Sequence, residues 1–335
     1  MMRRRLTIVL PCLLLVALIA GHTVAWFAGG RVLDRGFTTW VAQQRAAGWQ
    51  IDTGTPVRGG WPFAASLRIP DMAVTAGPPG APGRVSWHCE LVVLSLTAIS
   101  PDHLGIDLVG AQSLRIAPDP ERAFSADRLH VDVPLSRAAR IGTAGLEVRN
   151  LRGADVAIGL LTGQVVAAAE PSLTLAAEAI DLPSGQTLAF GPHISSVAVD
   201  ATVRGVLPPP GPLPAMVEAW RGAGGVVDVT HFALGWGPLG VSATAKLGFD
   251  EHLQPAGTAD LHVIGYAKAV EALAAEHVIS RDAARAATAV LTLLARAPPE
   301  GGAPEVAVPL TLRDRMVLMG RTPLVRVPEL VWGVQ

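Results

Sequence analysis

The stretch that decides the fold is residues 241–249, Val-Ser-Ala-Thr-Ala-Lys-Leu-Gly-Phe. Apolar residues occupy every second position from Val241 to Phe249, and small or polar residues fill the positions between them. Successive side chains of a β-strand point to opposite faces, so this spacing predicts a strand with one apolar face. Such strands are typical of antiparallel sheets that have one covered side.

The same two-residue period recurs on both sides of this stretch. The apolar positions are Leu129, Val131, Val133 and Leu135; Val156, Ile158 and Leu160; Val197, Val199, Ala201 and Val203; Leu261 and Val263; and Val306, Val308, Leu310 and Leu312. Turns rich in Gly, Pro and Asp separate these segments. We therefore predict a mainly β fold with a few helices (α+β), in which the strands form a large antiparallel sheet that is curved or sandwich-like.

Two helical regions interrupt the strands. One is expected over residues 214–220, and a helix pair is expected over 266–297, with its first arm ending near His277 and Ser280 capping the second. The second arm carries Ala284, Ala287, Val290, Leu291 and Leu294 on one stripe, and we expect the pair to close one end of the sheet. The proline-rich residues 208–214 are the expected boundary between an N-terminal β-rich portion, 49–207, and a C-terminal one, 215–335.

The N-terminus has the pattern of a membrane anchor. Arg3, Arg4 and Arg5 precede residues 6–30, which contain no Asp, Glu, Lys or Arg, and about 20 apolar residues are enough to span a bilayer. Trp26 and Phe27 are expected at the outer interface, and the arginines predict a cytoplasmic N-terminus. Residues 1–30 are thus expected to anchor a bacterial inner-membrane protein whose remaining mass is periplasmic. The alternative is a cleaved signal peptide that ends at Thr23-Val24-Ala25.

Residues 31–48 predict a helix that continues from the membrane. Leu33, Phe37, Trp40 and Val41 recur at the spacing of one helical face, and Gly48 is a plausible end. We expect this juxtamembrane helix to pack its apolar stripe on the sheet.

Composition narrows the class of partner. Charged residues make up 16% of the chain, below the roughly 25% typical of soluble domains, so apolar surface is expected beyond the anchor. The net charge of −1 gives no basic field, which argues against a nucleic-acid partner. The two cysteines, Cys12 and Cys89, would lie on different sides of the predicted membrane boundary, so no disulfide is expected.

The sequence contains no motif that predicts chemistry. Nucleophile elbows, phosphate-binding loops and zinc-binding spacings do not occur, so we expect no catalytic, cofactor-binding or metal-binding residues and no enzyme activity. The cluster Asp250-Glu251-His252 is interpreted as the polar tip of a hairpin, and His88 and Glu90 as the solvated face of a strand. The tryptophans Trp61, Trp87, Trp220, Trp236 and Trp332 are interpreted as core anchors in preference to a binding platform.

Several short motifs, taken in order, resemble a known family. They are Val-Arg-Gly-Gly-Trp-Pro-Phe at 57–63, Trp-Gly-Pro-Leu at 236–239, Leu-Gly-Phe-Asp at 247–250 with Leu-Gln-Pro-Ala-Gly at 253–257, and Val-Pro-Leu-Thr-Leu at 308–312. Together they resemble the alphaproteobacterial family called domain of unknown function 2125, which would have Phe at Trp61 and a glycine near Arg315. The resemblance implies an envelope protein with a layout similar to AsmA-like proteins, and no known activity.

Three functions are weighed from these patterns. The first is a lipid-binding or lipid-guiding module with an apolar sheet face, and the second is a structural or assembly factor that contacts other envelope proteins. The third, an enzyme, has the least support. An apolar face that stays open over more than a few hundred Å² would favour lipid, whereas a closed core would favour a scaffold.

Overall fold

The computed structural model describes residues 2–77, 83–97, 99–135, 142–183, 188–209, 211–297, 303–330 and 332, with side chains from Ala17 onward. The chain divides into two compact units, Met1–Ala138 with Leu146–Ala154, and Ala139–Gly145 with Asp155–Gln335. The stretch 208–214 lies inside the second unit. Strands make up 52% of the chain, and every pairing defined among the described strands is antiparallel. The predicted class, mainly β with a few helices, is confirmed.

Unit 1 consists of one long helix and a set of antiparallel strands. The elements are α1 (Met2–Ala46), β1 (Gln50–Asp52), β2 (Val57–Gly59), β3 (Ala64–Ala76), β4 (Val85–Thr97), β5 (His103–Ile116), β6 (Arg122–Ser125), β7 (Arg128–Pro134) and the end of β8 (Gly142–Gly153). Strand β3 pairs with β1, β2 and β4, and β4 pairs with β5. Both β6 and β7 pair with β5.

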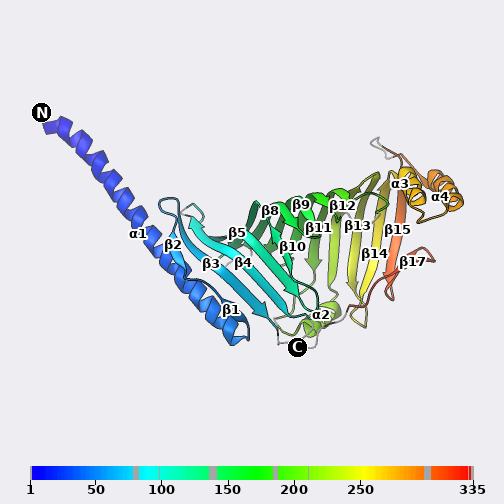
Figure 1. Cartoon of the computed structure of the whole chain (residues 1–335), viewed down its shortest axis with the longest axis horizontal. Helices are drawn as coiled ribbons and strands as arrows, with labels where there is room; N and C mark the ends of the chain where they lie inside the picture. The colour runs from blue at the N-terminus through cyan, green and yellow to red at the C-terminus, as the bar shows by residue number, and fades with distance from the viewer. Residues whose placement is uncertain are drawn as a thin grey trace. The chain divides into compact units, whose positions relative to one another are not determined.

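The core of unit 1 forms where α1 lies along these strands (Figure 1). Leu67 and Ile69 of β3 are fully buried, as is Cys89 of β4. Leu33 of α1 is 5% exposed and belongs to the same cluster, and Phe37 packs against it from the next turn. The predicted packing of the 31–48 stripe is therefore confirmed for Leu33 and Phe37, and this side of the sheet is closed by a helix.

The helix begins to pack on unit 1 earlier than the sequence suggested. The indole N–H of Trp26 donates to the carbonyl of Ala64 at 2.8 Å, and the His22 ring contacts the carbonyl of Pro62. Trp26 also packs against the core cluster, and Gly30 is buried. One side of the helix over residues 22–30 therefore contacts the strands, whereas the anchor over residues 1–30, with Trp26 and Phe27 at its outer interface, stays a prediction. The other side, with Val24 and Phe27, stays exposed.

Membrane spanning itself stays a prediction. Among the residues that the structure describes, no helix is both long and apolar enough to cross a bilayer. Residues 6–16 of the predicted span, with Cys12 among them, lie outside the described side chains. The helix α1 is continuous from Met2 to Ala46, and Gly48, at φ +89°, follows its end as predicted.

The described part of unit 2 is built from a run of antiparallel strands and three helices. Its elements are β9 (Ala157–Ala167), β10 (Ser172–Asp181), β11 (His193–Arg204), α2 (Leu213–Gly222), β12 (Val226–Trp236), β13 (Leu239–Phe249), β14 (Pro255–Ile264), α3 (Tyr266–Ala275), α4 (Arg281–Leu294), β15 (Glu305–Arg313), β16 (Met316–Met319) and β17 (Thr322–Arg326). Each strand from β9 to β17 pairs with the next strand along the chain.

The helices of unit 2 lie at the ends of its strands (Figure 1). At one end, the indole N–H of Trp220 in α2 donates to the carbonyl of Arg204, and its ring meets Phe249 edge-on. At the other end, α3 contacts β13 and α4 contacts β15. The Ser280 Oγ accepts from the Ala283 N–H at 3.2 Å, which confirms the predicted cap.

The apolar stripe predicted on α4 is only partly covered. Ala284 is buried, but Val290 is 54% exposed and Leu294 is 59% exposed. Leu293, which was outside the predicted stripe, is 87% exposed. Helix α4 therefore buries the small residue Ala284 and leaves Val290, Leu293 and Leu294 exposed.

Candidate functional site

The first candidate site is a wide apolar face on unit 2. Directly opposed residues of paired strands share a face, so the register orders side chains into rows across β9–β15. The central row consists of Gly163, Leu175, Val199, Phe232, Ala243, Leu261 and Val308. The rows on either side consist of Leu161, Ala177, Val197, Leu234, Val241, Val263 and Val306, and of Val165, Leu173, Ala201, Val229, Ala245, Ala259 and Leu310.

A β-bulge keeps these rows apolar. Val229 and Phe232 are three residues apart, so in a regular strand they would point to opposite faces. The pairing of β12 shifts between these two residues, against both β11 and β13, and the shift returns both side chains to the apolar face. We call the three rows together the open face.

The open face is not closed by other elements. Of its residues only Ala177 and Val306 are buried, whereas every member of the central row remains partly exposed. Leu173 is 40% exposed and Val165 is 46% exposed. Between the outermost strands and rows, the open face measures about 29 Å by 14 Å, or about 390 Å², at about 4.8 Å between strands and about 6.8 Å between rows. A contiguous apolar patch of that size is comparable to the largest patch on a typical monomer, which is often functional.

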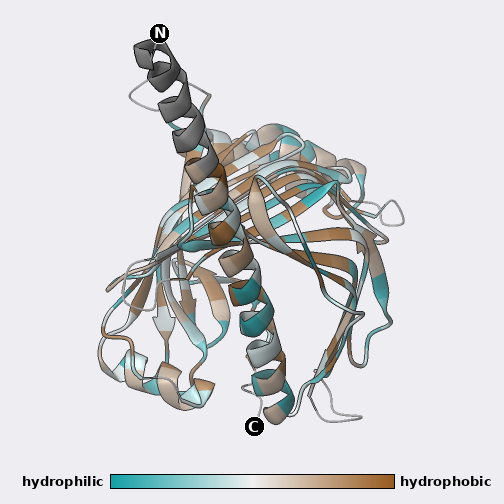
Figure 2. Ribbon diagram, turned by 90° about the vertical axis from the view of Figure 1, so that its left-hand side faces the viewer, coloured by the Kyte–Doolittle hydropathy of each residue, from teal (hydrophilic) through white to brown (hydrophobic). Residues whose placement is uncertain are grey.

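The opposite face of the same strands is polar. Ser242, Thr244 and Lys246 alternate with the apolar positions of β13, and all three are exposed. Figure 2 shows hydrophobic and hydrophilic residues following one another along strands of the protein, as brown and teal bands. Strand β9 departs from the predicted pattern, because its Ile158 and Leu160 share the face of Glu178, while Leu161 supplies the open face. The sequence therefore identified the two-sided pattern but assigned the wrong side in β9.

The second candidate site is an apolar rim on unit 1, where α1 first meets the strands. A hollow of about 280 Å³ lies there, and its lining includes His22, Trp26, Phe63, Leu96 and Leu135. Beside it, Phe63 is 87% exposed and Trp61 is 55% exposed, both in the β2–β3 turn. Ile99, in the β4–β5 turn, is 94% exposed.

The rim was missed by sequence reasoning. Trp61 was expected to anchor the core, and this expectation is wrong, because its ring lies at the tip of a turn. The others are placed as expected or nearly so: Trp220 is buried, Trp87 packs on the unit 1 core, and Trp236 and Trp332 are half-buried with bonded indole N–H groups. The signal available in the sequence was Trp61-Pro62-Phe63 directly after two glycines, which is a turn and not a core strand.

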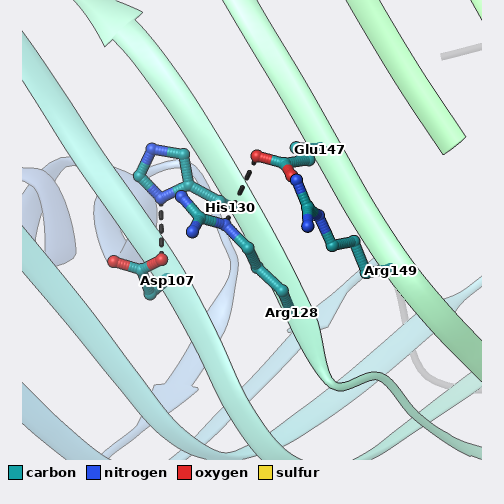
Figure 3. A network of polar contacts seen from close by, with 5 residues as sticks. All are labelled: Asp107, Arg128, His130, Glu147 and Arg149. Carbon is teal, nitrogen blue, oxygen red and sulfur yellow. Dashed lines mark hydrogen bonds and ion pairs between the residues drawn. The ribbon is translucent and has the colours of Figure 1, made fainter. Parts of the chain in front are cut away.

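The third candidate is a polar network on unit 1, drawn in Figure 3. The His130 Nδ1 lies 2.7 Å from the Asp107 carboxylate, and Glu147 pairs with both Arg128 and Arg149. The hydrogen bond from Arg149, together with the nearby charges of Arg128 and His130, holds the pKa of Glu147 below its usual range. Each carboxylate thus has a basic side chain as its partner across or along neighbouring strands. Pairs this exposed are screened by water and add little to stability, and we interpret the network as a structural one.

Two polar clusters noted in the sequence lie where they were expected. Asp250 begins the turn between β13 and β14, where its carboxylate accepts from the backbone N–H groups of His252 and Gln254 at 2.8 Å. His88 and Glu90 are exposed on β4 while Cys89 between them is buried. Within the described part of the chain, no group of three His, Cys, Asp or Glu side chains is placed to hold a metal ion. The absence of a catalytic, cofactor or metal site stays a prediction.

Comparison of the sequence and structure with known proteins identifies a family. Searches of curated proteins and of solved structures yield no match. A family profile matches residues 26–328, which begin at the tryptophan that docks α1 onto unit 1 and extend past the last strand. The chain therefore belongs to the bacterial family described as "Uncharacterized protein conserved in bacteria (DUF2125)".

Proposed function

We propose that this chain is a non-catalytic, membrane-anchored protein of the bacterial cell envelope that binds or guides lipid on the open face of unit 2. The observation that carries the proposal is the central row from Gly163 to Val308, in which no residue is buried. Unit 1 provides the contrast, because α1 covers its strands and Leu67 and Ile69 are fully buried there. A comparable cover is missing over the central row among the described residues.

An acyl chain suits this surface on physical grounds. The face is apolar, long in both directions and without charged side chains in its three rows, so it offers dispersion contacts and no hydrogen-bond pattern that would select a polar ligand. Burying one side of about ten methylenes would contribute roughly 4 kcal/mol, taking half of the value for full burial. That magnitude supports reversible binding of a chain and is consistent with guiding it.

The anchor is proposed on the N-terminal half of α1. Arg3–Arg5 followed by an uncharged apolar run supports a single span in the inner membrane, with a cytoplasmic N-terminus and a periplasmic body. Retention of the segment is supported by the His22 contact with Pro62, which cleavage after Ala25 would remove. The alphaproteobacterial source and the layout similarity to AsmA-like proteins remain predictions and fit this location.

Site-specific photocrosslinking in living bacteria tests lipid binding. Benzoyl-phenylalanine replaces Phe232 on the open face in one strain and the adjacent His231, which is exposed on the opposite face, in a matched control. The first replacement adds only a benzoyl group to a phenyl ring that is already present. After irradiation, intact-mass spectrometry is expected to find a phospholipid adduct at position 232 and none at position 231.

Two outcomes contradict the proposal. Equal lipid adducts at both positions would mean that the label reports only the nearby membrane. A crosslink from position 232 to protein alone would mean that another chain covers the open face.

The second candidate function is an assembly factor, and α4 favours it. Val290, Leu293 and Leu294 form an exposed apolar group at the C-terminal end of this helix, of a kind that partner proteins cover. The same crosslinker at Leu293, with exposed Arg285 on α4 as its control, is expected to capture an envelope protein if this function holds. Equal crosslinking from both positions would argue against a specific partner.

A further inference from the structure

We propose that the rim of unit 1, defined by Trp61, Phe63, Ile99 and the outward residues Val24 and Phe27 of α1, inserts into the outer leaflet of the bilayer that holds α1. This proposal rests on the membrane anchor proposed above and adds a second contact with the same membrane. Its occupant is lipid: the hydrocarbon and headgroup boundary around the helix.

The exposed apolar residues gather where the helix leaves the fold. The first contacts of α1 with the strands are His22 with Pro62 and Trp26 with Ala64, so the β2–β3 turn lies beside this part of the helix. On the helix itself, Val24 is 68% exposed and Phe27 is 55% exposed, which places them on the side away from the core. Helix and turn therefore present apolar side chains at the same level.

The length of the helix indicates what covers them. Residues 6–21, the apolar part that precedes the first strand contact, extend about 24 Å at 1.5 Å per residue. The hydrocarbon core of a bilayer is about 30 Å thick. With the arginines at the inner boundary, the remaining distance of about 6 Å brings the outer boundary of the hydrocarbon to the level of Trp26 and Phe27. A span of this length therefore immerses the rim.

The chemistry of the rim agrees with that depth. Tryptophan and phenylalanine are the residues that settle at the boundary between headgroups and acyl chains, where apolar groups insert by about 5–10 Å. The lining of the neighbouring hollow contains no Asp, Glu, Lys or Arg, so immersion does not bury a formal charge there. A protein partner at the same place would have to share it with the lipid that surrounds the emerging helix.

Depth-dependent fluorescence quenching on the full chain tests the proposal. The protein is placed in phospholipid nanodiscs whose lipids carry a nitroxide just below the headgroup, and single cysteines are labelled with bimane. One sample uses the native Cys12 as a reporter of the anchor, and the others carry C12S with either Phe63→Cys or Ile116→Cys. Cys89 is fully buried, and the C12S protein alone gives the background from it.

Ile116 is the matched control because it is an exposed apolar residue at the far end of unit 1. It is 47% exposed and lies at the end of β5, whereas His103 at the beginning of that strand is next to the rim turn. The strand separates the two ends by about 40 Å at about 3.3 Å per residue. We expect the loss of fluorescence at position 63 to be several times that at position 116.

The outcomes separate the rim from the anchor. Quenching at positions 12 and 63 but not at 116 supports both, whereas quenching at 63 without 12 overturns the anchor and with it the insertion of the rim beside the anchor. Quenching at 12 with position 63 no different from position 116 overturns the rim and leaves the anchor in place. Equal lack of quenching at all three positions overturns both.

Discussion

Replacing Leu33 by alanine tests whether the second half of α1 is part of the fold of unit 1. Leu33 is 5% exposed and packs in the core cluster with Leu67, Ile69 and Cys89. Truncating a buried leucine removes transfer free energy and leaves a cavity, at a cost of about 2–5 kcal/mol. Its neighbour Val32 is 59% exposed on the same helix, so Val32→Ala is expected to change stability by less than about 0.5 kcal/mol.

The assay is thermal unfolding of the full chain in detergent, monitored through the circular dichroism signal of the β-strands. Hydrogen exchange measured on peptides from β3 identifies which unfolding transition belongs to unit 1. For a domain of about 150–250 residues each kcal/mol shifts Tm by about 2–4 °C, so a cost of about 3 kcal/mol lowers the Tm of unit 1 by about 6–12 °C. Equal and small shifts for L33A and V32A would refute the packing of α1 and show that this half of the helix is a detached stalk.

Two further predictions concern a close approach and a titrating pair. A Cβ on Gly225 would lie 2.3 Å from the ring of Trp220, so Gly225→Ala is expected to destabilise unit 2 by about 1–3 kcal/mol. At the end of α2, a Cβ on Gly222 meets nothing within 4 Å, so Gly222→Ala is expected to stabilise unit 2 by about 0.5–1 kcal/mol. A higher Tm for Gly225→Ala than for Gly222→Ala in thermal unfolding would contradict this geometry. The hydrogen bond to Asp132 raises the pKa of His103, so the stability of this pair is fully present below the ordinary histidine pKa and is lost as pH rises through the raised value. Asp132→Asn is expected to lower the pKa of His103 in an NMR titration, and an unchanged titration would exclude the pair as its cause.

The strands were predictable because each carries its own evidence. Alternation of Val241, Ala243, Ala245 and Leu247 determines which side chains share a face, whatever the tertiary structure is. The helix pair was predictable for the same local reason, since Ser280 and the periodic residues after it define a start and a face. The register across strands and the bulge in β12 were not, because they depend on pairing between distant segments.

The N-terminal helix shows where hydropathy stops being informative. Residues 22–30 are apolar in either environment, and the sequence does not distinguish a helix covered by lipid from one covered by strands. The contact of the Trp26 indole with the Ala64 carbonyl shows that strands cover one side of this segment. The sequence also could not predict that the open face of unit 2 stays uncovered. A strand that packs under a helix and a strand that binds a ligand have the same alternation of apolar and polar residues.

The turn between β15 and β16 gives a physical reason for the glycine that the sequence analysis expected near Arg315. Asp314 and Arg315, between β15 and β16, have φ values of 51° and 61°, and two positive values in a two-residue turn are the geometry that favours glycine at the second position. The expected glycine near Arg315 is thus a matter of backbone conformation. The side chain of Arg315 forms an ion pair with Glu329.

Helix α1 is uninterrupted and contacts the strands of unit 1 from His22 onward. The orientation of these strands around the helix axis is therefore tied to the N-terminal turns of the same helix. Each residue inserted between Ala17 and Gly21 would turn unit 1 by about 100° around the helix axis and move it by about 1.5 Å along it. The phase of the helix therefore determines which side of unit 1 faces any neighbour bound to those first turns. Insertions of one or two residues would change that side, whereas an insertion of seven would nearly restore it two turns further out.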